Sequence, residues 1–424
     1  MRFGTPTLLL LIASAVVTAS AGDTLRLRPM TVSAKAAERV QRGIWTGVGV
    51  EVSTADLRIL VADRPSFVHA DVPIPGVGLV EVTFRRHDVF IPGLLAVRMT
   101  SKGPRMIDPS RFVASYIGTS PDGRDISMVT TSDIMLVDIT GDKSYVIEPD
   151  WCGQHTLAPA KPGSARCETN SEDVSPTIRE LVRHTKPEDD VQSMDTLMMT
   201  VAIEGDYDLV RWAKMNTSSA LAYIARVINV TSRIYERDFS VRLSIAATRL
   251  WEKPDDPYPS NASVFQLIDT FVSTYETTMT DVPRHLGLFI TARGGRGGIA
   301  KSIGGVCESG VNYCATDIVG DIDDDPWDGE YAWDAALVSH EIAHVCGAIH
   351  TQSCYWPSGP LDSCVQSESG SCVTYEATRP RLGTIMSYCH QTRANGGGVR
   401  MEFHPENRRV LRAFLESAPC VGAR

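Results

Sequence analysis

The sequence lacks the features of nucleic-acid-binding and membrane-spanning proteins. Its formal net charge is −10, and no block of Lys and Arg offsets the acidic excess, which argues against a nucleic-acid partner. After residue 21 no stretch reaches the roughly 18 apolar residues of a membrane span, so we expect no membrane anchor. Internal repeats are absent too, which excludes a repeat architecture. With 43% hydrophobic residues, the 424-residue chain can still form sizeable cores and suits two domains.

The first 21 residues have the pattern of a secretory signal. Arg2 supplies a positive start, residues 7–17 form an apolar run, and Ala19-Ser20-Ala21 offers a cleavage site between small residues. We therefore expect a secreted, extracellular protein. Ten cysteines in an exported chain predict disulfides, and eight of them follow residue 300.

Residues 22–190 are typical of a β-rich region. Apolar and polar residues alternate over 80–85, which predicts a half-buried strand, and 134–148 predict a hairpin that turns at Gly141. The polar, charged stretch 168–193 predicts an exposed linker open to proteases. No catalytic constellation is evident in this half of the chain.

Residues 191–424 alternate between the two periodicities of secondary structure, which favours a mixed α/β sheet with helices packed on it. Period-two patterns predict strands at 196–203, 241–245 and 286–291. Helical spacing predicts helices at 220–235, 264–272 and 333–346.

One motif in this half points to metal chemistry. It reads H-E-x-x-H-x-x-G-x-x-H, and its fixed members are His340, Glu341, His344, Gly347 and His350. Two histidines four apart lie on one helix face, so both can reach one metal ion. Glycine tolerates the sharp turn that returns His350 as a third nitrogen ligand. Three protein ligands leave the fourth position of one zinc ion open, as in catalytic sites.

Glu341 is placed to act as the general base and acid. It lies beside two ligands but is badly placed to be a fourth. Zinc lowers the pKa of a bound water to about 7, and a neighbouring carboxylate can take the proton of that water and pass it to a leaving amine. The motif therefore predicts zinc-dependent hydrolysis of peptide bonds.

The motif and a downstream methionine turn, residues 383–390 with Met386, resemble the metzincin zinc proteases, and specifically the adamalysin-like (reprolysin) branch. The tail at 403–405, followed by a short helix, is similar to secreted members of that branch. The resemblance covers roughly 195–424. It implies an α/β metzincin-type catalytic domain after a β-rich pro-domain, divided as 1–21 signal peptide, 22–190 pro-domain with linker, and 191–424 catalytic domain.

The resemblance also implies roles for residues outside the motif. Met386 is expected to pack beneath the metal without ligating it. Tyr388 either packs or steadies the tetrahedral intermediate, since a tyrosine at this spacing ligates zinc or serves that role in astacin and serralysin relatives. Gly298 and Ala300 belong to a stretch, 297–300, that in metzincins is an edge strand pairing with the substrate backbone; the alternative is a flexible turn.

The cysteines leave the route to latency open. Related pro-segments can use a thiolate to occupy the open zinc position, and Cys152 is the candidate here. We favour instead a local Cys152–Cys167 disulfide, with the pro-domain inhibiting by covering the cleft. Cys346 is either a buried thiol or a disulfide partner. Arg183 and Lys186 are single basic candidates for processing, without a basic quartet around them.

The acidic loop 321–330 suggests a calcium site, because hard cations favour clustered carboxylates. It lacks the spacing of a calcium loop, which favours a solvated loop. The expected function is a secreted zinc metalloendopeptidase acting on proteins or peptides, with its own pro-domain as intramolecular inhibitor. A non-catalytic binding module is the contrasting hypothesis, and the intact Glu341 argues against it. A thiol hydrolase using Cys152 and His155 lacks supporting residues.

Overall fold

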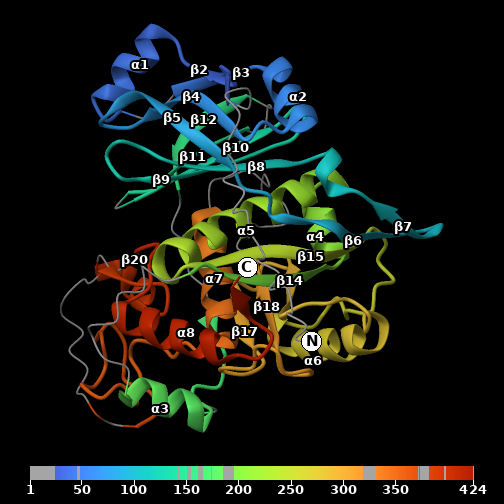
Figure 1. Ribbon diagram of the computed structural model, residues 1–424, viewed down its shortest axis with the longest axis vertical. Helices are drawn as coiled ribbons and strands as arrows, with labels where there is room; N and C mark the ends of the chain where they lie inside the picture. The colour runs from blue at the N-terminus through green and yellow to red at the C-terminus, as the bar shows by residue number, and fades with distance from the viewer. Residues whose placement is uncertain are drawn as a thin grey trace, which may run out of the picture.

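The computed structural model places two sheets and their helices around one long central helix (Figure 1). It describes residues 24–44, 48–141, 143–149, 154–160, 166–172, 174–184, 195–318, 331–370, 372, 382–395 and 398–423. The expected signal peptide, Cys152 and the acidic loop 321–330 lie outside these residues. Over the described ranges, no helix is both long enough and apolar enough to cross a bilayer.

Ten strands of the N-terminal half form the first sheet. In spatial order they are β1 (Thr24–Arg26), β4 (Phe67–Ile74), β5 (Gly78–Arg86), β8 (Ala114–Thr119), β9 (Asp125–Thr130), β10 (Met135–Thr140), β11 (Tyr145–Pro149), β12 (His155–Pro159), β3 (Val48–Val52) and β2 (Met30–Thr31). Helices α1 (Ala34–Gln41) and α2 (Thr54–Asp63) accompany it, each begun by a serine whose hydroxyl accepts a first-turn N–H. The predicted strand at 80–85 lies in β5, and the predicted hairpin is the antiparallel pair β10–β11.

Nine strands form the second sheet. In spatial order they are β13 (Arg166–Cys167), β17 (Gly297–Ala300), β18 (Tyr313–Asp317), β16 (Leu286–Thr291), β14 (Leu197–Gly205), β15 (Val241–Trp251), β6 (Phe90–Thr100) and β7 (Gly103–Ile107), with β21 (Gly422–Ala423) pairing with β14 outside this row. Strands β18, β16, β14, β15 and β6 are mutually parallel, and β17 runs antiparallel to β18.

The helices of the second half pack on this sheet or beside it. They are α4 (Tyr207–Trp212), α5 (Thr217–Phe239), α6 (Val264–Thr278), α7 (Tyr331–Val345) and α8 (Pro405–Ser417). Helix α3 (Pro176–His184), two short 3-10 helices, η1 (Pro109–Arg111) and η3 (Cys389–Asn395), and the small pair β19 (Leu382–Gly383) and β20 (Gly398–Val399) complete the described elements. All three predicted strands and all three predicted helices are present, so the mixed α/β architecture is confirmed.

Helix α5 lies between the two sheets. Figure 1 shows the N-terminal strands on one side of it and α7, α8 and β17 on the other. Almost its whole length is buried, which a helix with a solvent face would not be. Apolar side chains of both halves, among them Val129, Leu136 and Ile224, therefore share one core.

The fold differs from the expected pattern in two places. Strands β6 and β7 belong to the N-terminal half in sequence but to the second sheet in space, so the N-terminal half contributes strands to both sheets. The expected linker is wrong over Pro176–His184, which form helix α3. Its buried residues Ile178 and Val182 have helical spacing, but polar neighbours hide that short pattern in the sequence.

The expected disulfides are present in the second half. They join Cys307 to Cys420, Cys354 to Cys372, and Cys364 to Cys389. Two of the three therefore tie down the loops that follow the histidine motif. The sequence left open whether Cys346 is a buried thiol or a disulfide partner, and the structure shows a buried free thiol.

Candidate metal centre

Helix α7 presents two histidines on one face, and the turn after it brings in a third. Gly347 has φ +95°, a conformation that side chains rarely adopt, and its N–H bonds to His344 O at 2.8 Å. A Cβ at Gly347 would also lie 2.5 Å from Cδ1 of Ile178 on α3. The motif glycine is therefore needed both for the turn and for the close approach of α3.

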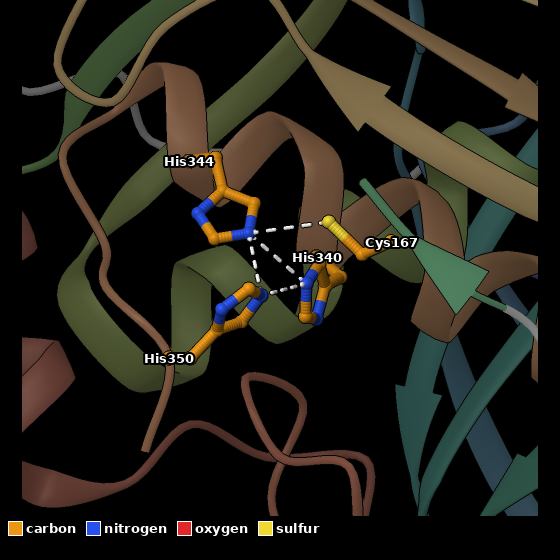
Figure 2. A group of neighbouring side chains, drawn as sticks. All are labelled: Cys167, His340, His344 and His350. Atoms are coloured by element: carbon orange, nitrogen blue, oxygen red, sulfur yellow. Dashed lines mark hydrogen bonds between the residues drawn. The ribbon is translucent and has the colours of Figure 1, made fainter. Parts of the chain in front are cut away.

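The three imidazoles point toward one another (Figure 2). The Nε2 atoms of His340, His344 and His350 lie 3.0 to 3.1 Å apart. A tetrahedral zinc with bonds of about 2.0–2.1 Å would hold its nitrogen ligands about 3.3–3.4 Å apart. The observed triangle is close to that spacing.

The opposite ring nitrogens are already bonded. Nδ1 of His340 lies 2.7 Å from Ile385 O, and Nδ1 of His344 lies 2.9 Å from Ala348 O. Both partners are carbonyls, which only accept, so Nδ1 carries the proton and Nε2 has a free lone pair. Burial lowers the pKa of His340 and of His344 well below the usual value, which favours the neutral form that binds metal.

His350 has a different partner. Its Nδ1 lies 2.8 Å from Oε1 of Glu368, in the loop tied by the Cys354–Cys372 disulfide. A carboxylate behind a metal-ligating histidine fixes the ring and raises its basicity. Nothing in the sequence around Glu368 marks this role, because it depends on how the loop folds back.

These residues fit a zinc ion. Three buried ring nitrogens converge, and their lone pairs would repel one another without a cation between them. The motif histidines could therefore hold a metal, as expected from their spacing.

Cys167 lies at the same point and can supply a fourth ligand. Its Sγ is 3.6 Å from Nε2 of His344, and a tetrahedral zinc with a Zn–S bond of about 2.3 Å would place sulfur and nitrogen about 3.6 Å apart. The favoured Cys152–Cys167 disulfide is wrong, because Cys167 is a free thiol. The sequence offered two cysteines in similar polar settings, and no local pattern shows which reaches the histidines.

The segment around Cys167 is held in place as a strand. β13 runs parallel to β17, with Arg166 opposite Gly297 and Cys167 opposite Gly298. The N–H of Glu168 continues the ladder to Gly298 O at 3.1 Å. The stretch 297–300 is thus a strand, with β18 on one side and β13 on the other.

Glu341 lies beneath this strand and is fully buried. Its Oε2 accepts from the Thr169 hydroxyl at 3.2 Å and lies 3.5 Å from Sγ of Cys167. Its Oε1 is buried and has no hydrogen-bond partner within the described part of the chain. Burial raises the pKa of Glu341 to about 8, against the opposing effect of the bonds from Cys167 and Thr169.

Gly298 and Ala300 both contact this arrangement. A Cβ at Gly298 would lie 2.5 Å from Oε1 of Glu341, so only glycine allows the strand to pass over the carboxylate. The N–H of Ala300 donates to the Thr169 hydroxyl at 2.8 Å. Thr169, which sequence reasoning missed, therefore connects the β17 edge to Glu341.

The methionine turn, residues 383–390, packs against the histidines and contacts His340 through the carbonyl of Ile385. Met386 is fully buried, and its carbonyl accepts from the N–H of Thr351 at 3.0 Å. The Tyr388 hydroxyl donates to Cys167 O at 3.1 Å and lies 3.2 Å from Nε2 of His350. The Tyr388 hydroxyl thus lies beside the candidate metal position. A pocket opens beside it, lined by apolar groups of Trp333, Leu337 and Val399.

A match to a family of known proteins agrees with this site. Residues 198–396 match the family model described as metallo-peptidase family M12 (Reprolysin_5). The crystal structure of metalloproteinase-II from Bacteroides fragilis is similar at 9% identity, covering 67% of this chain and 81% of that chain, with a TM-score of 0.32. No curated protein matches the chain. The family match confirms the resemblance drawn from the motif over 198–396 and supports a metallopeptidase acting on proteins or peptides.

Proposed function

We propose that this chain is a secreted zinc metalloendopeptidase that is made as a latent precursor. The observation that carries the proposal is the convergence of three buried imidazoles beside a buried carboxylate. His340, His344 and His350 hold the ion, and Cys167 occupies the remaining position in the precursor. The signal-like residues 1–21 and the disulfides support secretion.

Zinc, when bound, polarises a carbonyl and makes water a usable nucleophile near neutral pH. The chain's own groups then position the peptide and move the proton. Glu341 accepts a proton from the attacking water at Oε1, the oxygen that has no hydrogen-bond partner among the described residues, and returns it to the leaving nitrogen. The β17 edge, once β13 has left it, pairs with the substrate backbone, and Tyr388 stands beside the reacting carbonyl.

Latency in this proposal comes from one short strand. Cys167 takes the ligand position, β13 fills the β17 edge, and Thr169 engages Glu341. Departure of that strand frees all three at once. The proposed division is a signal peptide at 1–21, a pro-domain with linker at 22–190, and a catalytic domain at 191–424.

Two variants test the proposal. Glu341→Ala should keep zinc and fold but lose about 10²–10⁴-fold of its activity on quenched fluorescent casein after activation. Cys167→Ser should make the uncleaved precursor active, whereas Cys314→Ser, which changes another buried free thiol, should leave it latent. A chelator should abolish all activity. If Glu341→Ala cleaves casein as fast as the unmodified enzyme, Glu341 is not the general base. If the activated, unmodified chain does not cleave casein at all, the peptidase assignment fails and a binding module becomes the better reading.

A further inference from the structure

The N-terminal half is built into the second sheet and does not merely rest on it. β6 pairs along β15 from Ile245 opposite Phe90 to Trp251 opposite Met99. The N–H of Ile245 bonds to Val89 O at 2.5 Å at one end, and the N–H of Glu252 bonds to Met99 O at 3.0 Å at the other. Without β6, β15 would present an unpaired edge along its length.

A side-chain ion pair reinforces this strand pairing. Arg98 of β6 donates from Nε and one Nη to the two carboxylate oxygens of Glu252, at 2.6 and 2.9 Å. Two parallel bonds from a planar guanidinium fix both distance and orientation. The pair therefore sets the register of β6 against β15.

A second contact surface lies on α5. Arg226, only 1% exposed, donates to Asp138 of β10 and to Glu148 of β11, with shortest distances of 2.8 Å. Asn229, one turn further, donates to Tyr116 O at 3.1 Å and to the Ser127 hydroxyl at 2.6 Å. These groups are satisfied only while the first sheet covers the helix, since a buried charge without its partner is strongly unfavourable.

Apolar packing connects the same two parts. Val89, Phe90, Val113, Val129 and Leu136 from the N-terminal half belong to one core cluster with the residues of α5 and β15. Burial of such surface is the main source of association free energy, while the ion pairs select the orientation. The contact thus combines strand pairing, apolar burial and buried ion pairs, as lasting interfaces do.

This interface is remote from the cleft. In the second sheet β6 is separated from β17 by β15, β14, β16 and β18, so the N-terminal strands and the substrate edge lie at opposite ends. Among the described residues up to Thr169, the stretch from Arg166 to Thr169 is the part that reaches the histidines and Glu341. The bulk of the N-terminal half can therefore stay in place while the cleft is open.

We propose that residues 24–160 form a permanent subunit of the mature enzyme, which stays bound through β6 and α5 after the chain is cut, while activation requires only the departure of the Cys167 strand. The interaction surface is the β15 edge together with the outer face of α5, and its partner is this chain's own N-terminal fragment. The inference goes beyond the peptidase assignment, since it concerns association and not catalysis.

The test uses the full chain with a specific protease site replacing residues 161–165, between β12 and β13. This cut leaves the Cys167 strand and α3 on the C-terminal fragment, so only the proposed interface holds the pieces together. After complete cleavage on a denaturing gel, both fragments should elute together in size-exclusion chromatography with the mass of the uncut protein. Separate elution at micromolar concentration would overturn the inference.

A matched pair of variants tests which contacts hold the pieces. Arg226→Met leaves Asp138 and Glu148 buried without their cation, so the cut variant should dissociate at least tenfold more readily on dilution. Arg211→Met removes an arginine of α4 that pairs only locally with Asp208, and it should behave like the unmodified protein. If the Arg226→Met and Arg211→Met variants dissociate equally, the contacts of α5 do not contribute to the association.

Two further readouts keep the test independent of folding and of catalysis. If Arg226→Met does not fold before cutting, as judged by circular dichroism, Arg98→Ala at the partly exposed edge of β6 takes its place, with the same expected loss of association. Because the cut leaves the Cys167 strand in place, activity is measured on the cut protein that also carries Cys167→Ser. Co-elution of its fragments without any casein cleavage would refute the peptidase assignment and keep this inference. Casein cleavage by a separated C-terminal fragment of that variant would do the reverse.

Discussion

Replacing Glu368 should weaken zinc binding through His350 without touching the metal itself. The structure gives His350 the only carboxylate partner found behind a motif histidine in the described residues, at 2.8 Å, whereas His340 and His344 donate to backbone carbonyls. A hydrogen bond to a charged group contributes roughly 1.5–3 kcal/mol and one to a neutral group roughly 0.5–1.5 kcal/mol. The charge on Glu368 therefore accounts for about 1–1.5 kcal/mol.

These magnitudes separate two substitutions. Glu368→Gln keeps an acceptor and loses only the charge, so zinc affinity should fall about tenfold, since 1.4 kcal/mol corresponds to a factor of ten. Glu368→Ala loses both, and affinity should fall toward 100-fold, the upper end for such partners. Glu308→Gln, an exposed carboxylate of another loop, should leave zinc affinity unchanged and serves as the control.

The assay is competition for zinc against a chromophoric chelator, with all variants as the uncleaved chain so that Cys167 is present in each. Thermal unfolding of the zinc-loaded forms gives a second readout, because a ligand that binds only the native state raises its stability. If both Glu368 variants fold and hold zinc as tightly as the unmodified protein, the carboxylate does not support the site and the reasoning from its distance is wrong.

Three further predictions concern the site and the interface. His344→Ala should lose most of its zinc in metal analysis, and wild-type zinc content would contradict the ligand assignment. Gly298→Ala should keep zinc but lose about tenfold or more of the activated peptidase activity, because the added methyl displaces Glu341; Gly422→Ala, where a Cβ meets open space, is the control. Burial opposes ionisation of Glu236, but His87, Arg242 and Arg85 together hold its pKa below the ordinary 4.5. Ionised Glu236 therefore stabilises the folded state above pH 4.5, and this stabilisation is lost as the pH falls through the lower pKa that Glu236 has in the folded protein. In acid, the free energy of unfolding should therefore fall more steeply for the unmodified chain than for Glu236→Gln.

The elements that the sequence predicted are those with long, regular patterns. Helix α5 follows one periodicity over many residues and was located within four residues of its ends. Strand β15 was predicted from its first residue, Val241, but it extends to Trp251, beyond the predicted 241–245. The metal ligands were predictable for the same reason, since their spacing within one helix and one turn fixes their geometry. Local pattern was sufficient wherever a single segment determined the result.

The features that were missed depend on contacts between distant segments. The pairing of β6 with β15 joins residues about 150 positions apart, and the sequence of neither strand predicts which strand it pairs with. The meeting of Cys167 with the histidines and of Glu368 with His350 likewise requires the tertiary fold. Helix α3 was missed for a local reason, because its short apolar stripe lies within a charged stretch.

Helix α3 has a practical consequence for producing the catalytic part by itself. Ile178 packs against Gly347 and against Gly304, so α3 supports the turn that carries His350. Arg179 adds a contact over the Tyr355 ring, 4.6 Å from its centroid. A recombinant fragment that starts at Leu197, the first residue of β14, would lack α3 and expose the turn to water. Expression boundaries should therefore be placed before Val174, and a natural maturation cut after His184 would loosen the same turn unless the severed helix stays bound.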